Sequence, residues 1–256
     1  MNILNAFDGA TDEIIKPSDI MNRIEGFPET VIVTFGSRML EKLLDECGGE
    51  NNAEIVANLQ ISFTVPVYRI KYKGKELAIY QTAVGGPATV GLLEETAAMG
   101  GKKFLIFGSC GSLDKDITDG HIVVPDEAYR DEGTSYHYAP PSPDGYIRVN
   151  SAERLFSILT ELEVPALRGR TWTTDAFYRE TRGNFEKRRN EGCLTVEMEC
   201  SAAAAFAAFR NVEVYQFLYT ADNLGGGEWE RRLLGGMTDD HRRTYARIAL
   251  EAAIRL

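Results

Sequence analysis

The sequence contains few of the residues that build metal centres and disulfide frameworks. Its 256 residues include 4 cysteines and 3 histidines, and no two cysteines are spaced as Cys-x-x-Cys. Zinc sites and disulfide scaffolds need such residues in number and at short spacing. We therefore expect no metal site and no disulfide framework, and a reducing compartment is the default.

Long apolar runs and an excess of positive charge are also missing. No stretch approaches the roughly 18 apolar residues of a membrane span, and Met1–Glu13 lacks the basic patch and apolar run of a signal peptide. The 28 Lys and Arg against 38 Asp and Glu give a formal net charge of −10. An acidic surface repels nucleic-acid phosphates and anionic lipids. Nucleic acid and membranes are therefore poor candidate partners, and a cytoplasmic enzyme is the expectation.

Short apolar segments alternate with longer amphipathic ones, and no linker interrupts them, so residues 1–256 are predicted to form one domain. Strands separated by helices favour βαβ units and a mostly parallel or mixed α/β sheet. Strands are predicted at Val31–Phe35, Val65–Tyr72, Leu77–Val84, Phe104–Phe107, Ile122–Val124, Trp172–Thr174, Cys193–Val196 and Tyr215–Tyr219. Helices are predicted at Met39–Glu46, Ala88–Met99, Ala152–Glu161, Asn184–Arg189, Ala202–Phe209 and Asp239–Arg255.

Sites in such sheets lie at the carboxyl ends of strands, and five predicted strand ends carry more than turn residues. They are Gly36-Ser37-Arg38, Gly85-Gly86-Pro87, Gly108-Ser109-Cys110-Gly111, Glu197-Met198-Glu199 and Thr220-Ala221-Asp222-Asn223. Glycines here also suit ordinary turns, and Asp222 also suits a helix N-cap. Neither a G-x-G-x-x-G nor a G-x-x-x-x-G-K sequence is present, which argues against dinucleotide and P-loop sites.

Glu197 and Glu199 follow an apolar strand and precede an alanine-rich segment. In strand geometry both side chains point to one face, whereas in the first turn of a helix they complement its dipole. A buried carboxylate costs several kcal/mol unless polar groups satisfy it. The hydroxyls of a sugar would do so. Elsewhere, the guanidinium of Arg38 and the backbone of Gly108–Gly111 suit an anion.

Four of these segments together resemble the nucleoside phosphorylase family. They are Gly85-Gly86-Pro87, Gly108-Ser109-Cys110-Gly111, Asp175-Ala176-Phe177-Tyr178 and Val196–Ala202, and the resemblance runs from about Val31 to the C-terminus. The family includes uridine phosphorylases, hexameric bacterial purine nucleoside phosphorylases and the methylthioadenosine/S-adenosylhomocysteine nucleosidases. The resemblance implies an α/β fold whose central mixed sheet is partly closed into a barrel. It also implies a homo-oligomer (dimer or hexamer) and N-glycosidic bond cleavage without a cofactor, with phosphate as co-substrate.

The resemblance also implies roles for individual residues. By that similarity Glu199 holds the ribose hydroxyls, Met198 packs under the sugar and Glu197 supports them. The remaining substrate contacts fall on Val196 beside the sugar segment, on Phe177 stacking on the base, and on Cys110 and Gly111 at the boundary between sugar and base. Gly36, Arg38 and Ser109 lie near phosphate.

Asp222 falls where purine-specific members keep an aspartate that protonates the departing base. A general acid contributes roughly 10²–10⁴ in rate and must be partly protonated near neutral pH. The pKa of Asp222 therefore has to rise from about 3.9, and burial behind Tyr219 and Leu224 would raise it. Purine phosphorylases often have an arginine downstream that assists this acid. Arg231 and Arg232 are the candidates for it in this chain, and the spacing does not settle the assignment.

The sequence departs from the phosphorolytic pattern at several positions. Ile106 stands where those relatives carry an arginine, and Phe63 stands where an arginine from a neighbouring subunit would fall, although Arg69 is near. Hydrolytic relatives also lack the first arginine, but they need a glutamate near the first strand end. This chain has Arg38 there, with Glu41 one turn later. Phosphorolysis is favoured; a hydrolytic nucleosidase and a non-catalytic nucleoside-binding protein remain as alternatives.

The base preference follows from the segment after the Phe-Tyr pair. Uridine phosphorylases place a glutamine and an arginine there, whereas this chain has Arg179-Glu180-Thr181-Arg182 without a glutamine. Asp222 favours purines over uridine.

Overall fold

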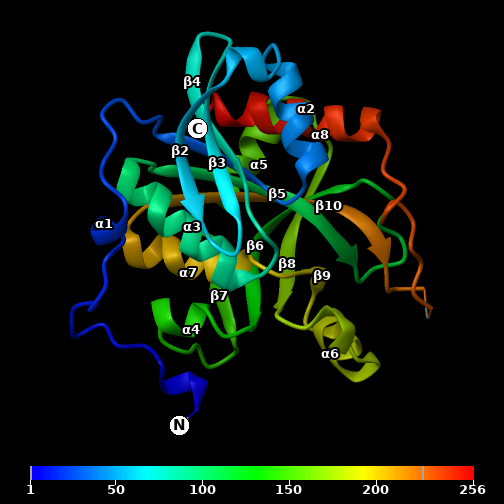
Figure 1. The fold of residues 1–256 in the computed structure, drawn as a ribbon. Helices are drawn as coiled ribbons and strands as arrows, with labels where there is room; N and C mark the ends of the chain where they lie inside the picture. The colour runs from blue at the N-terminus through cyan, green and yellow to red at the C-terminus, as the bar shows by residue number, and fades with distance from the viewer. Residues whose placement is uncertain (1, 227) are drawn as a thin grey trace.

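The computed structural model describes residues 2–226 and 228–256, in which strands and helices alternate along most of the chain (Figure 1). The strands are β1 Thr30–Thr34, β2 Glu54–Gln60, β3 Thr64–Tyr72, β4 Lys75–Gln81, β5 Lys103–Ser112, β6 Ile122–Asp131, β7 Tyr146–Arg148, β8 Ala166–Thr174, β9 Cys193–Glu197 and β10 Glu213–Asn223. The helices are α1 Pro17–Ile20, α2 Ser37–Glu46, α3 Gly86–Met99, α4 Ser135–Tyr138, α5 Ala152–Glu161, α6 Arg182–Asn190, α7 Cys200–Arg210 and α8 Asp239–Ala253, with 3-10 turns η1 Ile3–Asn5, η2 Glu50–Asn52 and η3 Phe177–Arg179. Each predicted strand and helix is present, whereas β2 and β7 were not predicted.

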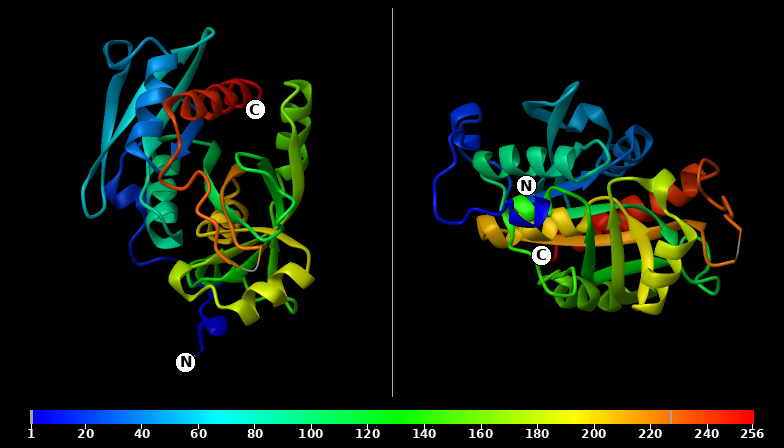
Figure 2. Two further views of the ribbon diagram at one scale, coloured as in Figure 1. Left: turned by 90° about the vertical axis from the view of Figure 1, so that its right-hand side faces the viewer. Right: turned by 90° about the horizontal axis from the view of Figure 1, so that it is seen from below.

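One mixed sheet joins all the strands, and part of it closes on itself. Its order is β10-β6-β8-β9-β5-β1-β4-β3-β2, and β10 also pairs with β5, so strands β5, β10, β6, β8 and β9 form a closed barrel. The barrel strands lie together in green, yellow and orange, and β2–β4 extend away from them in cyan (Figure 2). The predicted mixed, partly barrel-like α/β fold is confirmed.

The core lies on both faces of the sheet. Because side chains alternate along a strand, Val33 of β1 and Ile106 of β5 pack with α3 and α7, whereas Ile32 packs on the other side with Leu43 of α2 and Leu250 of α8. Burying each of these aliphatic side chains stabilises the fold by about 1.5–3 kcal/mol. The two apolar layers hold the strand ends, and the side chains they carry, in fixed positions.

Helices α2 and α8 begin at the same end of the molecule. Lys42 of α2 pairs with Asp239 at the start of α8 at 3.3 Å, and Glu46 at the end of α2 pairs with Arg247 at 2.8 Å. The N-terminal half of α8 therefore packs against α2, and the blue and red helices cross steeply (Figure 2). Their N-terminal turns face the carboxyl end of β1.

Several predicted strand ends differ from the structure, and two of these differences lie at the candidate site. The strand predicted to stop at Phe107 continues as β5 to Ser112, and the strand predicted to stop at Tyr219 continues as β10 to Asn223. Barrel closure causes this extension, since β5 and β10 pair with each other from Glu213↔Lys103 to Asn223↔Ser112. The Gly108–Gly111 segment is therefore a strand rather than a loop that presents its N–H groups to an anion.

On its other edge, β5 changes partners within this segment. It pairs with β1 as far as Ile106 and with β9 only from Gly111 onward. Ser109 and Cys110 lie between these two pairings, where the open part of the sheet and the barrel diverge. In open α/β sheets, ligands bind at such points of divergence.

Candidate active site

Glu199 is a buried carboxyl group held by the start of another helix. It is the N-cap of α7 and is 6% exposed. Its Oε1 accepts the backbone N–H of Gly85, the N-cap of α3, at 2.5 Å. Gly85 has φ +98°, a conformation that side chains with a Cβ rarely adopt. The glycine therefore aims its N–H at the carboxylate, which explains why the Gly-Gly-Pro segment and the Glu-Met-Glu segment belong to one site.

Glu197 anchors the same helix from inside. Its Oε2 accepts the N–H groups of Glu199 and Cys200 at 2.8 and 2.7 Å, and its Oε1 accepts the Thr173 hydroxyl at 2.6 Å. The chain turns after Glu197, so the idea that both glutamates share one strand face is wrong. Glu197 instead satisfies the free N–H groups at the start of α7. Met198, between the two glutamates in the sequence, lies in a partly exposed bend.

Burial raises the pKa of both glutamates. For Glu199 the next contributions are the charges of Glu197 and Asp175, and for Glu197 the charge of buried Glu132 acts in the same direction. Close carboxyl groups in a dry site cannot all ionise. The site therefore holds at least one neutral carboxyl group near neutral pH. The carboxyl groups of the site can then both donate hydrogen bonds to hydroxyl groups and accept hydrogen bonds from them.

Asp222 lies at an irregularity of β10. The pairing with β5 skips from Thr220↔Cys110 to Asp222↔Gly111, so Ala221 is the extra residue of a bulge. A Cβ on Gly111 would stand 2.8 Å from Cδ1 of Leu224 and 3.0 Å from Cγ1 of Val196, and would reach 3.4 Å from Oδ1 of Asp222. Glycine at position 111 therefore lets Leu224 and Val196 pack closely beside Asp222. No helix begins at Asp222, so the N-cap interpretation is wrong.

Burial raises the pKa of Asp222, as predicted, while a hydrogen bond from Trp229 and the charge of Arg232 oppose the rise. The indole Nε1–H of Trp229 donates to Oδ2 at 2.7 Å. Of the two arginines considered for this acid, Arg232 is the one whose charge acts on it. Arg231 instead donates to the carbonyl of Leu234.

Glu180 is a second acidic side chain at this end of the site, and sequence reasoning missed it. Burial, and then the charge of Asp222, raise the pKa of Glu180 to about 7. Glu180 stands three residues after Phe177, and Asp175, whose charge acts on Glu199, stands two residues before it. Turn η3 therefore connects the Glu199 end to the Asp222 end. It carries the half-exposed Phe177 ring, which lies tilted by 40° against the Tyr178 ring with 4.1 Å between centroids.

Cys110 and Ser109 connect the parts of the site. The buried Cys110 thiol lies close enough to Glu197 and Asp222 for both charges to raise its pKa, after the larger effect of burial. Ser109, the preceding residue, lines a cavity of about 440 Å³ together with Gly36 and Arg38. The three residues assigned to phosphate are thus brought together. Arg242 lines the same cavity and was not predicted.

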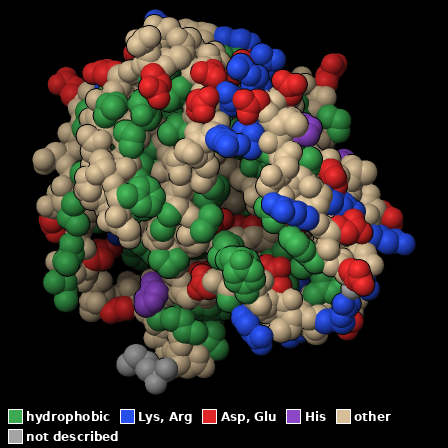
Figure 3. All heavy atoms as spheres, turned by 45° about the vertical axis from the view of Figure 1, so that its right-hand side comes forward, with side chains coloured by type: hydrophobic (Ala, Val, Ile, Leu, Met, Phe, Trp, Pro, Cys, Tyr) green, Lys and Arg blue, Asp and Glu red, His purple; other side chains and the backbone are tan. Residues whose placement is uncertain are grey.

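Figure 3 shows the face at which β5 and β10 end, with acidic side chains inside a hollow and hydrophobic side chains at its rim.

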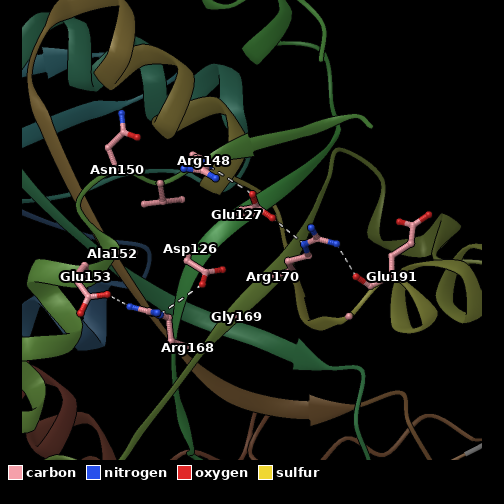
Figure 4. Close-up of a pocket in the computed structure, with 12 residues that line it drawn as sticks. Asp126, Glu127, Arg148, Asn150, Ala152, Glu153, Arg168, Gly169, Arg170 and Glu191 are labelled. Carbon is pink, nitrogen blue, oxygen red and sulfur yellow. Dashed lines mark hydrogen bonds and ion pairs between the residues drawn. The ribbon is translucent and has the colours of Figure 1, made fainter. Parts of the chain in front are cut away.

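A larger cavity of about 590 Å³ lies elsewhere, along β6 and β8. There Arg148 and Arg170 both pair with Glu127 (Figure 4). Arg168 pairs with Asp126 at 3.5 Å and also with Glu153. Because carboxylates neutralise all three arginines, this second cavity suits an anion less well.

Comparison with known proteins agrees with this geometry. Residues 32–255 match the family model described as the phosphorylase superfamily. The chain belongs to that superfamily. Among curated relatives, the guanosine phosphorylase of Halorubrum lacusprofundi is 26% identical over 232 residues, covering 89% of this chain and 90% of that protein. The DeoD-type purine nucleoside phosphorylase of Exiguobacterium sibiricum is 26% identical over 196 residues, covering 72% and 78%.

The fold comparison points to the same superfamily. The crystal structure of uridine phosphorylase from Vibrio fischeri superposes with a TM-score of 0.74, covering 96% of this chain and 100% of that chain at 21% identity. None of the helices in residues 2–226 and 228–256 combines the length and apolarity needed to cross a bilayer. Those residues also contain no group of three or more His, Cys, Asp and Glu arranged to hold a metal ion.

The departures from the phosphorolytic pattern of this superfamily have structural explanations. Ile106 is fully buried in the core beside α3 and α7. Arg69 donates to Glu54 at 3.1 Å and to the carbonyl of Gly26 at 3.2 Å. Glu41 accepts from Lys42 at 3.0 Å and is not among the described residues that line the Arg38 cavity. The glutamate that hydrolysis would need at this strand end is therefore turned elsewhere.

Proposed function

We propose that this chain is a nucleoside phosphorylase that transfers the pentose of a purine nucleoside to phosphate. The observation that carries the proposal is the position of β5. Its Ser109 lines an arginine-bearing cavity, while the adjacent Cys110 lies beside Glu197 and Asp222. An anion site, a group of carboxyls suited to sugar hydroxyls and an acid with a raised pKa therefore meet around two consecutive residues.

The proposed reaction assigns one task to each end of the site. Glu199, positioned by Glu197 and by the N–H of Gly85, holds the ribose hydroxyls. Asp222 gives its proton to a nitrogen of the base as the C–N bond breaks and the bond's electron pair stays with the base. A phosphate oxygen, held at Arg38 and Ser109, forms the new bond to the sugar carbon from the opposite face. The products are free base and a pentose 1-phosphate.

Purines are proposed as substrates because the base end of the site is acidic. Burial raises the pKa of both Asp222 and Glu180, and the charge of Asp222 raises the pKa of Glu180 further. A neutral carboxyl can donate to a base nitrogen, and an ionised one can accept from a ring N–H. The half-exposed Phe177 and the adjacent Val196 and Met198 complete the proposed surface for the nucleoside. We further propose that residues 1–256 act as one unit in a homo-oligomer, and that the free thiols of its cysteines suit a reducing cytoplasm.

A nucleoside panel with and without inorganic phosphate tests this proposal. The expected result is free purine and pentose 1-phosphate, formed only when phosphate is supplied. Buried Ile106, in place of an arginine, favours hydrolysis as a second candidate, which would give free pentose at a rate independent of phosphate. Binding of nucleosides without any turnover would contradict both enzymatic proposals.

Asp222→Asn tests the acid separately from the phosphate requirement. The variant should slow purine nucleosides by roughly 10²–10⁴, and it should slow a ribosyl substrate with a phenolate leaving group much less. A phenolate departs without a proton, so the acid contributes little there. Equal slowing of both substrates would argue against the acid role.

A further inference from the structure

We propose that Arg242, at the start of α8, is the second phosphate-binding guanidinium of this site, acting with Arg38. The proposal rests on the phosphorolytic function inferred above. Arg242 lines the 440 Å³ cavity together with Gly36, Arg38 and Ser109. Arg242 and Arg38 come from helices near the opposite ends of the chain, and the packing of α8 against α2 brings them together.

The charge of the cavity favours a multiply charged anion. Its described lining contains Arg38 and Arg242 as charged side chains and no carboxylate. Arg38 is the second residue of α2, so the free N–H groups and the positive dipole end of that helix add to the same field. The Ser109 hydroxyl supplies another donor. The cavity along β6 and β8 differs, because the carboxylates that pair with its arginines, Asp126, Glu127 and Glu153, themselves line it (Figure 4).

Arg242 is held in position before any ligand arrives. Its side chain is 15% exposed, and its Nη1 donates to Oδ1 of Asp239 at 3.1 Å. Asp239 in turn contacts Lys42 of α2 at 3.3 Å. The charge of Arg242 also opposes the rise in pKa that burial causes at Tyr219, another residue of the cavity lining. A guanidinium has five N–H donors in a fixed fork, so the pairing with Asp239 fixes one nitrogen while the others can serve phosphate.

The experiment measures steady-state kinetics with inorganic phosphate as the varied substrate in Arg242→Ala and Arg242→Gln. Losing one charge-assisted contact should raise the phosphate KM by roughly 10–100-fold, while the nucleoside KM at saturating phosphate changes by less than about 3-fold. Arg242→Lys keeps the charge without the fork and should recover part of the loss. Calorimetric titration of the native protein and Arg242→Gln with inorganic phosphate gives a readout independent of turnover.

Arg243→Ala is the matched control. Arg243 is adjacent in sequence but pairs with Asp45 at 3.6 Å and Glu46 at 3.5 Å, outside the cavity lining. This variant should leave the phosphate KM unchanged. Thermal unfolding of each variant, together with an unaltered nucleoside KM, establishes that the site is folded.

The outcomes separate the two proposals. A native protein that cleaves nucleosides at a rate independent of phosphate contradicts the phosphorolytic function itself. A native protein that requires phosphate, but whose phosphate KM rises in Arg38→Ala and stays unchanged in both Arg242→Ala and Arg242→Gln, overturns the role of Arg242 alone. A rise of the same size in Arg243→Ala would also overturn it, because loss of positive charge anywhere near α8 would then suffice.

Discussion

Trp229 donates its indole N–H to Oδ2 of Asp222 over 2.7 Å, although Trp229 itself is 59% exposed. Asn223 and Glu230, which follow Asp222 and Trp229 in the sequence, form an antiparallel bridge with two backbone hydrogen bonds of 2.9 Å, and this bridge holds the two segments together. The hydrogen bond favours the ionised carboxylate, whereas burial favours the protonated one. An exposed side chain thus adjusts the pKa of the proposed acid.

Replacing Trp229 by Phe should therefore move the pH dependence of the reaction. Without the donor, the pKa of Asp222 rises, so the acid stays protonated to higher pH. The alkaline limb of kcat/KM for a purine nucleoside should shift upward by about 0.5–1 pH unit. Trp172→Phe is the control, since the indole of Trp172 donates to Asp131 instead. An unchanged alkaline limb of kcat/KM in Trp229→Phe would contradict the effect of Trp229 on the pKa of Asp222.

Glu199 and Glu197 should respond differently to substitution. Glu199→Gln keeps an oxygen for the N–H of Gly85, so the fold should hold while kcat/KM falls roughly 10–100-fold through weaker ribose contacts. Glu197→Ala removes the acceptor of three hydrogen bonds at the start of α7 and should lower the free energy of unfolding by about 1–3 kcal/mol. Urea denaturation and nucleoside kinetics on both variants check this. Equal destabilisation by the two substitutions would contradict it.

Gly85→Ala should harm both stability and activity, because alanine strongly disfavours φ +98°. The expected loss is about 1–2 kcal/mol in the free energy of unfolding, with a higher nucleoside KM as the N–H turns away from Glu199. Gly91→Ala is the matched control. Gly91 lies inside α3 with nothing within 4 Å of an added Cβ, so this change should stabilise the protein by about 0.5–1 kcal/mol. Thermal unfolding distinguishes the two.

Glu180 should make stability depend on pH. Its pKa is about 7 in the folded protein, against about 4.3 when unfolded, so the folded state keeps a proton that the unfolded state has lost. Stability therefore falls as pH rises from about 4.3 through 7. Glu180→Gln removes this dependence. Relative to the native protein, the variant should gain on the order of 1 kcal/mol between pH 5 and pH 8. If urea denaturation gives a difference in the free energy of unfolding between Glu180→Gln and the native protein that does not change with pH, the Glu180 carboxyl is solvated and the prediction is wrong.

Local patterns were sufficient to predict most of the elements. Val31–Val33 and Phe104–Phe107 are apolar runs bounded by turn residues, and both are strands in the structure. The extension of β5 through Gly108–Ser112 was not predictable, since glycine and serine are poor strand formers. Only pairing with β10, more than 100 residues later, makes this segment a strand. Barrel closure is a non-local event that a short window of sequence does not contain.

Some residues of the proposed site were likewise predictable from local sequence patterns, and others were not. Glu199, Asp222 and Ser109 stand out because they belong to motifs that resemble one family. Arg242 reads as an ordinary charge on a helix, and Trp229 follows no pattern. Each acquires its partners from tertiary structure: Arg242 from the packing of α8 on α2, and Trp229 from the bridge between Asn223 and Glu230. The acidic Glu180 was visible beside the Phe-Tyr pair, but its proximity to Asp222 was not.

The position of α8 at Asp239–Ala253, after every strand, also sets the order in which the site is completed during translation. Ribosomes synthesise the carboxyl-bearing strands, including β9 and β10, before they reach Arg242. A nascent chain that has emerged as far as Asn223 already carries Glu199 and Asp222, but its anion cavity still lacks the lining residues Leu233, Leu234, Gly235, Met237 and Arg242. The newly made protein therefore brings Arg242 to the cavity beside Arg38 only when α8 docks.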